Sequence, residues 1–199
     1  MVRENTVMIA KFVNTLIEYE ILDEPNKENY IYALTLRLEQ IITFGFLLMI
    51  AIMLHKVFFG MVYSLAFVLL RKATGGFHAR TFIRCLAGTS TLFFLMLQII
   101  VPFLASHMEI SGLLLLLSIV CIYRYAPVNH PNLMLTVEEE NNHRRWSRII
   151  LFMELLFVCF GIFLKMKWQQ YIISGIILCA VFIVIAKIIG QEVTENEKG

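Results

Sequence analysis

Six long apolar runs follow one another along most of the chain, and short polar stretches separate them. The runs cover residues 41–54, 57–70, 89–105, 110–123, 149–164 and 168–189. A helix that crosses a membrane needs about 20 apolar residues, because each residue adds about 1.5 Å of length. The pattern predicts an all-α, polytopic membrane helical bundle with six transmembrane helices. Several runs are short, so four spans with a re-entrant hairpin is the alternative.

The segment 8–17, ahead of the first run, has a different pattern. Apolar residues recur there at helical spacing on one side, at Ile9, Phe12, Val13, Leu16 and Ile17. Polar residues occupy the opposite side, at Lys11, Asn14, Thr15 and Glu18. This pattern predicts an amphipathic helix lying on the membrane surface. Asp23 and Pro25 then predict a turn, and the segment lacks the continuous apolar core of a signal peptide, so we expect it to be retained.

Composition agrees with a membrane protein. Hydrophobic residues make up 59% of the 199 positions, and the mean hydropathy is +0.74. These values exclude an ordinary water-soluble domain. The formal net charge of +2 gives no indication of a nucleic-acid partner. No linker or repeat divides the chain, so we expect a single integral membrane domain over residues 1–199, in contact with the lipid bilayer.

The distribution of basic residues predicts the orientation. If the N-terminus is cytoplasmic, 14 of the 17 Lys and Arg residues fall in cytoplasmic segments. The three on the other side are Lys56, Lys165 and Lys167. Because Lys and Arg accumulate in the cytoplasmic loops of membrane proteins, we expect a multi-pass protein of the cell membrane with both termini in the cytoplasm.

Candidate chemistry lies in the basic loop between the second and third runs, where Cys85 follows His78. A thiolate attacks carbonyl groups far better than a thiol, so a catalytic cysteine needs a neighbouring base or positive surroundings. His78 can supply the base, while Arg80 and Arg84 supply positive potential. Three other cysteines lie inside apolar runs and are interpreted as buried packing residues, namely Cys121, Cys159 and Cys179.

The spacing of this pair needs a break in the helix. Seven residues are two helical turns, which separates the side chains of a straight helix by about 10.5 Å. Gly75 and Gly76 can provide the break, so that a new helix begins near Thr81 with Cys85 in its first turns. On these residues alone, a catalytic pair and a merely basic loop are equally supported. No histidine has metal-ligand spacing with a cysteine, so we expect no metal and no cofactor.

Glu154 is an outlier inside the fifth run, where an ionisable group is often functional. Its nearness to the start of that run favours a partly hydrated interfacial carboxylate. The nearby acidic residues 138–140 are interpreted as a solvated loop with local charge pairing.

Two motifs resemble those of a known family. The segment Gly75-Gly-Phe-His-Ala-Arg80, followed by Cys85, resembles the motif of the accessory gene regulator B (AgrB-like) membrane endopeptidases of Gram-positive quorum sensing. The later segment Tyr125-Ala-Pro-Val-Asn-His-Pro131 is similar to the Ala-Pro loop of the same family. Length, hydropathy and the basic loop agree, so the resemblance covers essentially the whole chain.

The resemblance implies a thiol protease in which His78 and Cys85 form the catalytic dyad and Arg71 and Gly76 are also required. It implies cleavage of a small AgrD-like precursor peptide through an acyl-enzyme thioester. An internal cysteine or serine of the precursor then closes a thiolactone or lactone ring, which gives the autoinducing peptide. The rival interpretation is a small transporter or exporter of peptides or ions. Whether the chain acts alone or as a homodimer stays open.

Overall fold

The computed structural model describes residues 2–19, 21–76, 81–128 and 136–190. The elements, in chain order, are α1 (Val2–Glu18), the 3₁₀ turn η1 (Glu24–Asn26), α2 (Lys27–Met53), α3 (Val57–Thr74), α4 (Phe82–Leu95), the π-helical turn η2 (Met96–Ile100), α5 (Val101–Ser106), α6 (Met108–Tyr125), α7 (Val137–Phe163) and α8 (Gln169–Ile189). The prediction of an all-α bundle is confirmed. The predicted turn at Asp23 and Pro25 corresponds to η1.

Six helical segments are long and apolar enough to cross a membrane, which confirms the predicted number. They comprise η1 with α2, then α3, then α4 to α5 as one continuous segment, then α6, α7 and α8. The alternative of four spans and a re-entrant hairpin is not what the structure has. The chain is therefore a multi-pass membrane protein. The helices extend beyond the apolar runs, and this supplies the length that several of the runs lack.

The third span contains a π-helical turn just before Pro102. The backbone N–H of Val101 donates to the carbonyl of Met96, five residues back. In that register the carbonyl of Leu97 would need the N–H of Pro102, which proline lacks. The ammonium of Lys56, in the turn between α2 and α3, donates to this carbonyl at 2.6 Å and to Oε1 of Gln98 at 3.1 Å.

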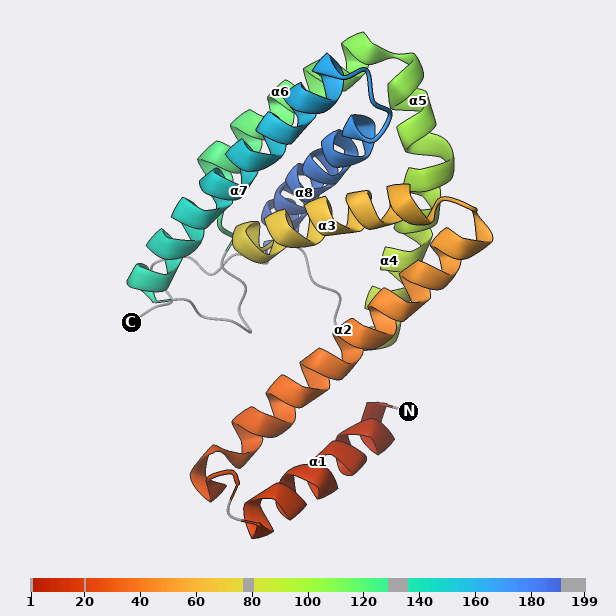
Figure 1. Ribbon diagram of the computed structural model, residues 1–199. Helices are drawn as coiled ribbons and strands as arrows, with labels where there is room; N and C mark the ends of the chain where they lie inside the picture. Colours follow the sequence, from red (N-terminus) through yellow and green to blue (C-terminus); the bar gives the residue numbers. More distant parts are fainter. Residues whose placement is uncertain (1, 20, 77–80, 129–135, 191–199) are drawn as a thin grey trace.

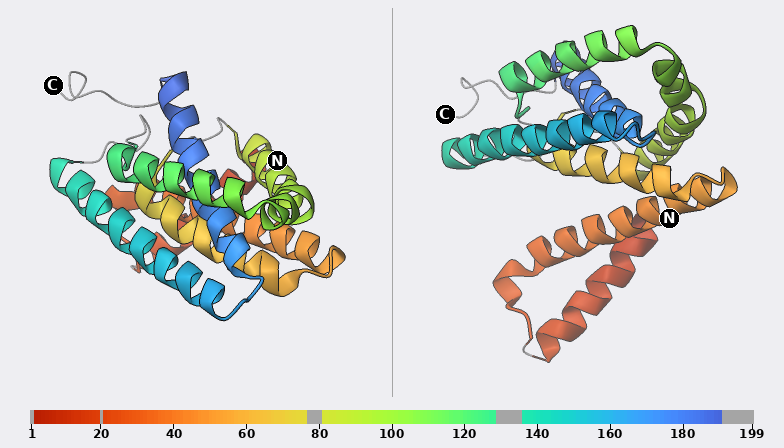
Figure 2. Two further views of the ribbon diagram at one scale, coloured as in Figure 1. Left: turned by 90° about the horizontal axis from the view of Figure 1, so that it is seen from above. Right: turned by 45° about the horizontal axis from the view of Figure 1, so that its top comes forward.

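Helix α8 forms the centre of the larger part of the bundle, and α3, α6 and α7 pack around it (Figures 1 and 2). It is the most apolar of the six spans, with a mean hydropathy of 2.9. Its packed face includes Ile176, Cys179, Ile183 and Ala186, which are fully buried, whereas Val181 and Val184 are each 43% exposed. In a membrane, lipid covers the apolar surface that neighbouring helices leave open. A second apolar cluster joins α2, α3 and α4 through residues such as Ala51, Tyr63 and Phe93.

The N-terminal helix α1 packs against α2, and this pair projects away from the rest of the bundle (Figures 1 and 2). The predicted amphipathic helix over 8–17 is present. Val13 is fully buried, and Ile9, Leu16 and Ile17 are half-buried. Phe12, which belongs to the same predicted stripe, is exposed. The apolar stripe is therefore divided between contact with α2 and the outer surface.

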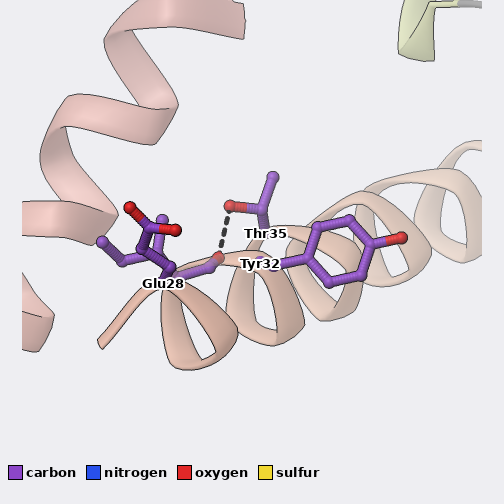
Figure 3. Close-up of a pocket in the computed structure, with 4 residues that line it drawn as sticks. Glu28, Tyr32 and Thr35 are labelled. Atoms are coloured by element: carbon purple, nitrogen blue, oxygen red, sulfur yellow. Dashed lines mark hydrogen bonds between the residues drawn. The ribbon is translucent and has the colours of Figure 1, made fainter. Parts of the chain in front are cut away.

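An open cavity of about 320 Å³ lies near the start of α2 (Figure 3). Glu28, Ile31, Tyr32 and Thr35 line it. The hydroxyl of Thr35 donates to the carbonyl of Ile31 within the same helix, so it does not point to a ligand. None of the candidate site residues that the structure describes borders this cavity.

The acidic residues 138–140 are in the first turn of α7 rather than in a loop, which corrects the prediction for this segment. Thr136 and Glu139 form a reciprocal capping box, in which the hydroxyl accepts from the Glu139 N–H and the carboxylate accepts from the Thr136 N–H. Such a cap extends a helix into polar sequence. The predicted charge pairing is present, since Glu140 and Arg144 form an ion pair at 3.1 Å.

Candidate active site

Cys85 lies in the first turn of α4, as the sequence predicted. Thr81 precedes the helix with an extended backbone, and the N–H of Cys85 donates to the Thr81 carbonyl at 3.0 Å. The side chain of Thr81 makes no capping hydrogen bond among the described residues. The thiol of Cys85 is half-buried. This places the sulfur near the positive end of a helix, at the edge of the bundle.

Arg71 is held in the last turn of α3 by contacts on two sides. Its guanidinium donates to the carbonyl oxygen of Gly75 and lies over the ring of Phe182, 5.1 Å from the ring centroid. It is also within electrostatic range of the sulfur atoms of Cys179 and Cys85. The arrangement brings a fixed positive charge from α3 toward the cysteine of α4. No signal in the sequence pointed to Phe182, which lies 111 residues further along.

The loop after α3 is bound to the segment after α6. The N–H of Val128 donates to the carbonyl of Thr74 at 2.9 Å, and Gly75 forms a parallel bridge with Val128. Thr74, Ala126 and Val128 are buried. The two short motifs that carried the family resemblance are therefore in direct contact.

Both glycines of the loop have positive φ, 64° at Gly75 and 115° at Gly76. L-residues rarely adopt such backbone angles. A Cβ at Gly75 would collide with the Val128 carbonyl, and one at Gly76 would collide with the guanidinium of Arg71. Glycine is thus required at both positions for two reasons: the backbone has a positive φ, and a neighbouring atom occupies the space of a Cβ.

The remaining site residues are placed only in part. His78 and Arg80 lie outside the described residues, so the predicted pairing of His78 with Cys85 remains a prediction. Arg84 precedes Cys85 on α4 and its side chain is exposed. The described part of the site therefore consists of Cys85, Arg71, Gly76 and Arg84.

Comparison with models of protein families gives a match to accessory gene regulator B over residues 9–186. The match covers most of the chain. The chain belongs to the accessory gene regulator B family. Comparison with curated proteins and with solved structures found no match. Membership of the AgrB family implies a role in processing the autoinducer of a quorum-sensing system.

In this AgrB-family protein Glu154 is buried among the helices, which corrects the prediction of a partly hydrated carboxylate. It lies about 8 Å beyond Ile149, the start of the apolar run, at about 1.5 Å per residue. It is only 7% exposed, and neither carboxylate oxygen has a hydrogen-bond partner among the described residues. The sequence placed Glu154 correctly along the apolar run, while its burial was decided by how α7 packs against its neighbours.

The other cysteines differ from one another in burial. Cys179 is buried and lies 3.6 Å from the Phe67 carbonyl, whereas Cys121 is half-buried. Cys159 is exposed on the outer surface of α7, so the prediction that it is buried is wrong. An apolar run predicts that a residue lies inside a span, but not which face of the helix carries it.

Proposed function

We propose that this protein is a membrane cysteine endopeptidase that cleaves a small precursor peptide and promotes its cyclisation to an autoinducing peptide. Cys85 is the nucleophile and His78 the general base. The observation that carries the proposal is the position of Cys85 in the first turn of α4, within electrostatic range of the Arg71 guanidinium. Cysteine nucleophiles are typically found beside cations and at helix N-termini.

In the first half of the reaction, His78 takes the proton of the Cys85 thiol, and the sulfur attacks the carbonyl carbon of the scissile peptide bond. The carbon–nitrogen bond then breaks, and the imidazolium returns the proton to the leaving amine. The N-terminal part of the precursor stays on Cys85 as a thioester, and the C-terminal part leaves.

In the second half, an internal thiol or hydroxyl of the precursor gives its proton to His78 and attacks the thioester carbonyl. The bond to the Cys85 sulfur breaks, the sulfur takes up that proton, and a thiolactone or lactone ring forms. A thiol–thioester exchange is close to balanced in energy, so it needs no ATP. Water must be kept from the thioester, and a half-buried cysteine at the edge of an apolar bundle suits this requirement.

The start of α4 offers donors for the oxyanion. The backbone N–H groups of Phe82, Ile83 and Arg84 have no partner within the helix, because they belong to its first turn. The N–H of Cys85 is occupied by the Thr81 carbonyl. We assign these three amides, which have no partner within α4, as the candidates that stabilise the tetrahedral intermediate.

The proposed orientation puts this site on the cytoplasmic side. The ends of α3 and α6 and the start of α4 lie at the same end of the alternating spans as most of the basic residues. By the positive-inside rule this end faces the cytoplasm, where a newly made precursor would be bound to the membrane. The whole chain acts as one membrane domain in this proposal.

The deciding experiment uses the full chain in proteoliposomes with a synthetic precursor peptide. Cys85→Ala and His78→Ala should each abolish the shortened peptide, and the unmodified protein should form a hydroxylamine-sensitive adduct that Cys85→Ala lacks. Cys159→Ala is the matched control, since this cysteine is exposed on another helix. If Cys85→Ala still shortens the peptide, the endopeptidase assignment is wrong.

The same preparation separates the proposal from a transporter or exporter. A transporter would move the intact peptide across the bilayer and would keep that activity in Cys85→Ser. If the protein is an endopeptidase with Cys85 as nucleophile, Cys85→Ser should produce the shortened peptide far more slowly than the unmodified protein does.

A further inference from the structure

A cation–aromatic contact joins the last turn of α6 to the first half of the neighbouring helix α7. The guanidinium of Arg148, on α7, lies over the ring of Tyr123, on α6, with 4.2 Å to the ring centroid. Arg124 follows Tyr123 in the last turn of α6. All three side chains are exposed. One guanidinium therefore lies on the aromatic ring, and the residue next to that ring in α6 carries a second guanidinium.

An exposed apolar stripe leads along α6 to this rim. It consists of Leu113, Leu116, Leu117 and Val120, each between 58% and 63% exposed. The spacing of three and four residues places them on one face of the helix, and the next positions on that face are Tyr123 and Arg124. On α7, Phe152 follows Arg148 by one turn and is exposed as well. The surface is thus apolar along its length and cationic at one end.

We propose that this surface, defined by Tyr123, Arg124, Arg148 and the α6 stripe, binds one anionic phospholipid. The acyl chains lie along the stripe, and the phosphodiester lies between the two guanidinium groups. A guanidinium can donate two parallel hydrogen bonds to phosphate oxygens. In a zwitterionic headgroup, the ammonium group of the lipid competes with the guanidinium for the same phosphate. Within the described part of the chain, neither arginine pairs with a carboxylate, so both can take up an external anion.

The ring of Tyr123 explains why the site is ordered before the lipid arrives. Arg148 would otherwise lose rotamer freedom on binding, which costs free energy. Its seat on the ring holds the guanidinium at the height of the headgroups, where aromatic residues of membrane proteins gather. An acidic peptide would satisfy the arginines but would leave the adjoining apolar stripe unused, so the stripe favours a lipid.

The test is titration of the purified full-length protein with phosphatidylglycerol or phosphatidylcholine, followed by native mass spectrometry. We expect one phosphatidylglycerol to bind about 25-fold more tightly than phosphatidylcholine. A cation at the headgroup level contributes roughly fivefold, so Arg148→Gln should weaken phosphatidylglycerol binding by about fivefold and the Arg124→Gln, Arg148→Gln double variant by about 25-fold. Phosphatidylcholine binding should not change.

Arg37→Gln is the matched control, because Arg37 is an exposed arginine in the first half of another helix, α2. Its replacement removes the same charge. It should leave phosphatidylglycerol binding within about twofold. An equal loss in Arg37→Gln would show a general surface-charge effect and overturn the proposal. So would displacement of the lipid by millimolar inorganic phosphate, or arginine-dependent binding of an acidic peptide without preference for phosphatidylglycerol. If a variant does not purify intact, competition between the two lipids on the unmodified protein decides the headgroup preference.

Discussion

The guanidinium of Arg71 occupies the space that a side chain at Gly76 would need. The same guanidinium donates to the Gly75 carbonyl and packs on Phe182, so it cannot move without losing those contacts. Arg71 and Gly76 therefore act as one unit, although four residues separate them. Their joint effect is to fix how the loop leaves α3 on its way to Cys85.

Gly76→Ala should reduce precursor cleavage by at least about tenfold. The added Cβ meets the Arg71 guanidinium, and the φ of 115° is strained for any L-residue by about 1–3 kcal/mol. Gly88→Ala, in the helix of Cys85, is the control, since a Cβ there meets no atom within 4 Å. Rates of cleavage in proteoliposomes compare the two variants. Equal activities of the two variants would show that the contact between the Gly76 backbone and the Arg71 guanidinium is not needed for cleavage.

Lys56→Met should destabilise the protein by about 1–3 kcal/mol, because it leaves the Leu97 carbonyl without a donor in an apolar setting. Thermal unfolding in detergent measures the effect. Lys167→Met removes an exposed lysine at the same end of the bundle and should change stability by less than about 0.5 kcal/mol.

A double variant tests the cause of that loss. Pro102→Ala restores an N–H that can reach the Leu97 carbonyl, so it should recover part of the stability that Lys56→Met removes. Simple additivity of the two changes would argue against the proposed link between Lys56 and the proline.

Glu154→Leu should keep the protein as stable as the original or raise its unfolding temperature by a few degrees. The carboxyl group is buried without a hydrogen-bond partner among the described residues, and an apolar side chain of similar volume removes that cost. Cleavage activity should stay within about twofold. A large loss of activity in both Glu154→Leu and Glu154→Gln would instead assign a functional role to the carboxyl group.

Thr136→Ala should fray the start of α7 with a loss of about 1 kcal/mol in local stability, because it removes the hydroxyl that accepts from the Glu139 N–H. Hydrogen exchange of the amides at 137–140 should increase while the amides after Arg148 keep their protection. Thr15→Ala, which removes an exposed hydroxyl bound within its own helix, should leave exchange in α7 unchanged.

The sequence by itself determined the spans, the amphipathic α1, and the start of a new helix near Thr81 before Cys85. These features depend on local periodicity and on the thickness of the hydrocarbon layer, and both can be read from neighbouring residues. The tertiary structure alone decided that Gly75 meets Val128, that Arg71 meets Phe182, that Lys56 reaches Leu97, and that Glu154 faces the interior. Such contacts join residues far apart in the chain. They depend on how each helix is rotated about its axis and at what angle it crosses its neighbours. A helix that is apolar on all sides carries no sequence pattern that indicates which face packs inward.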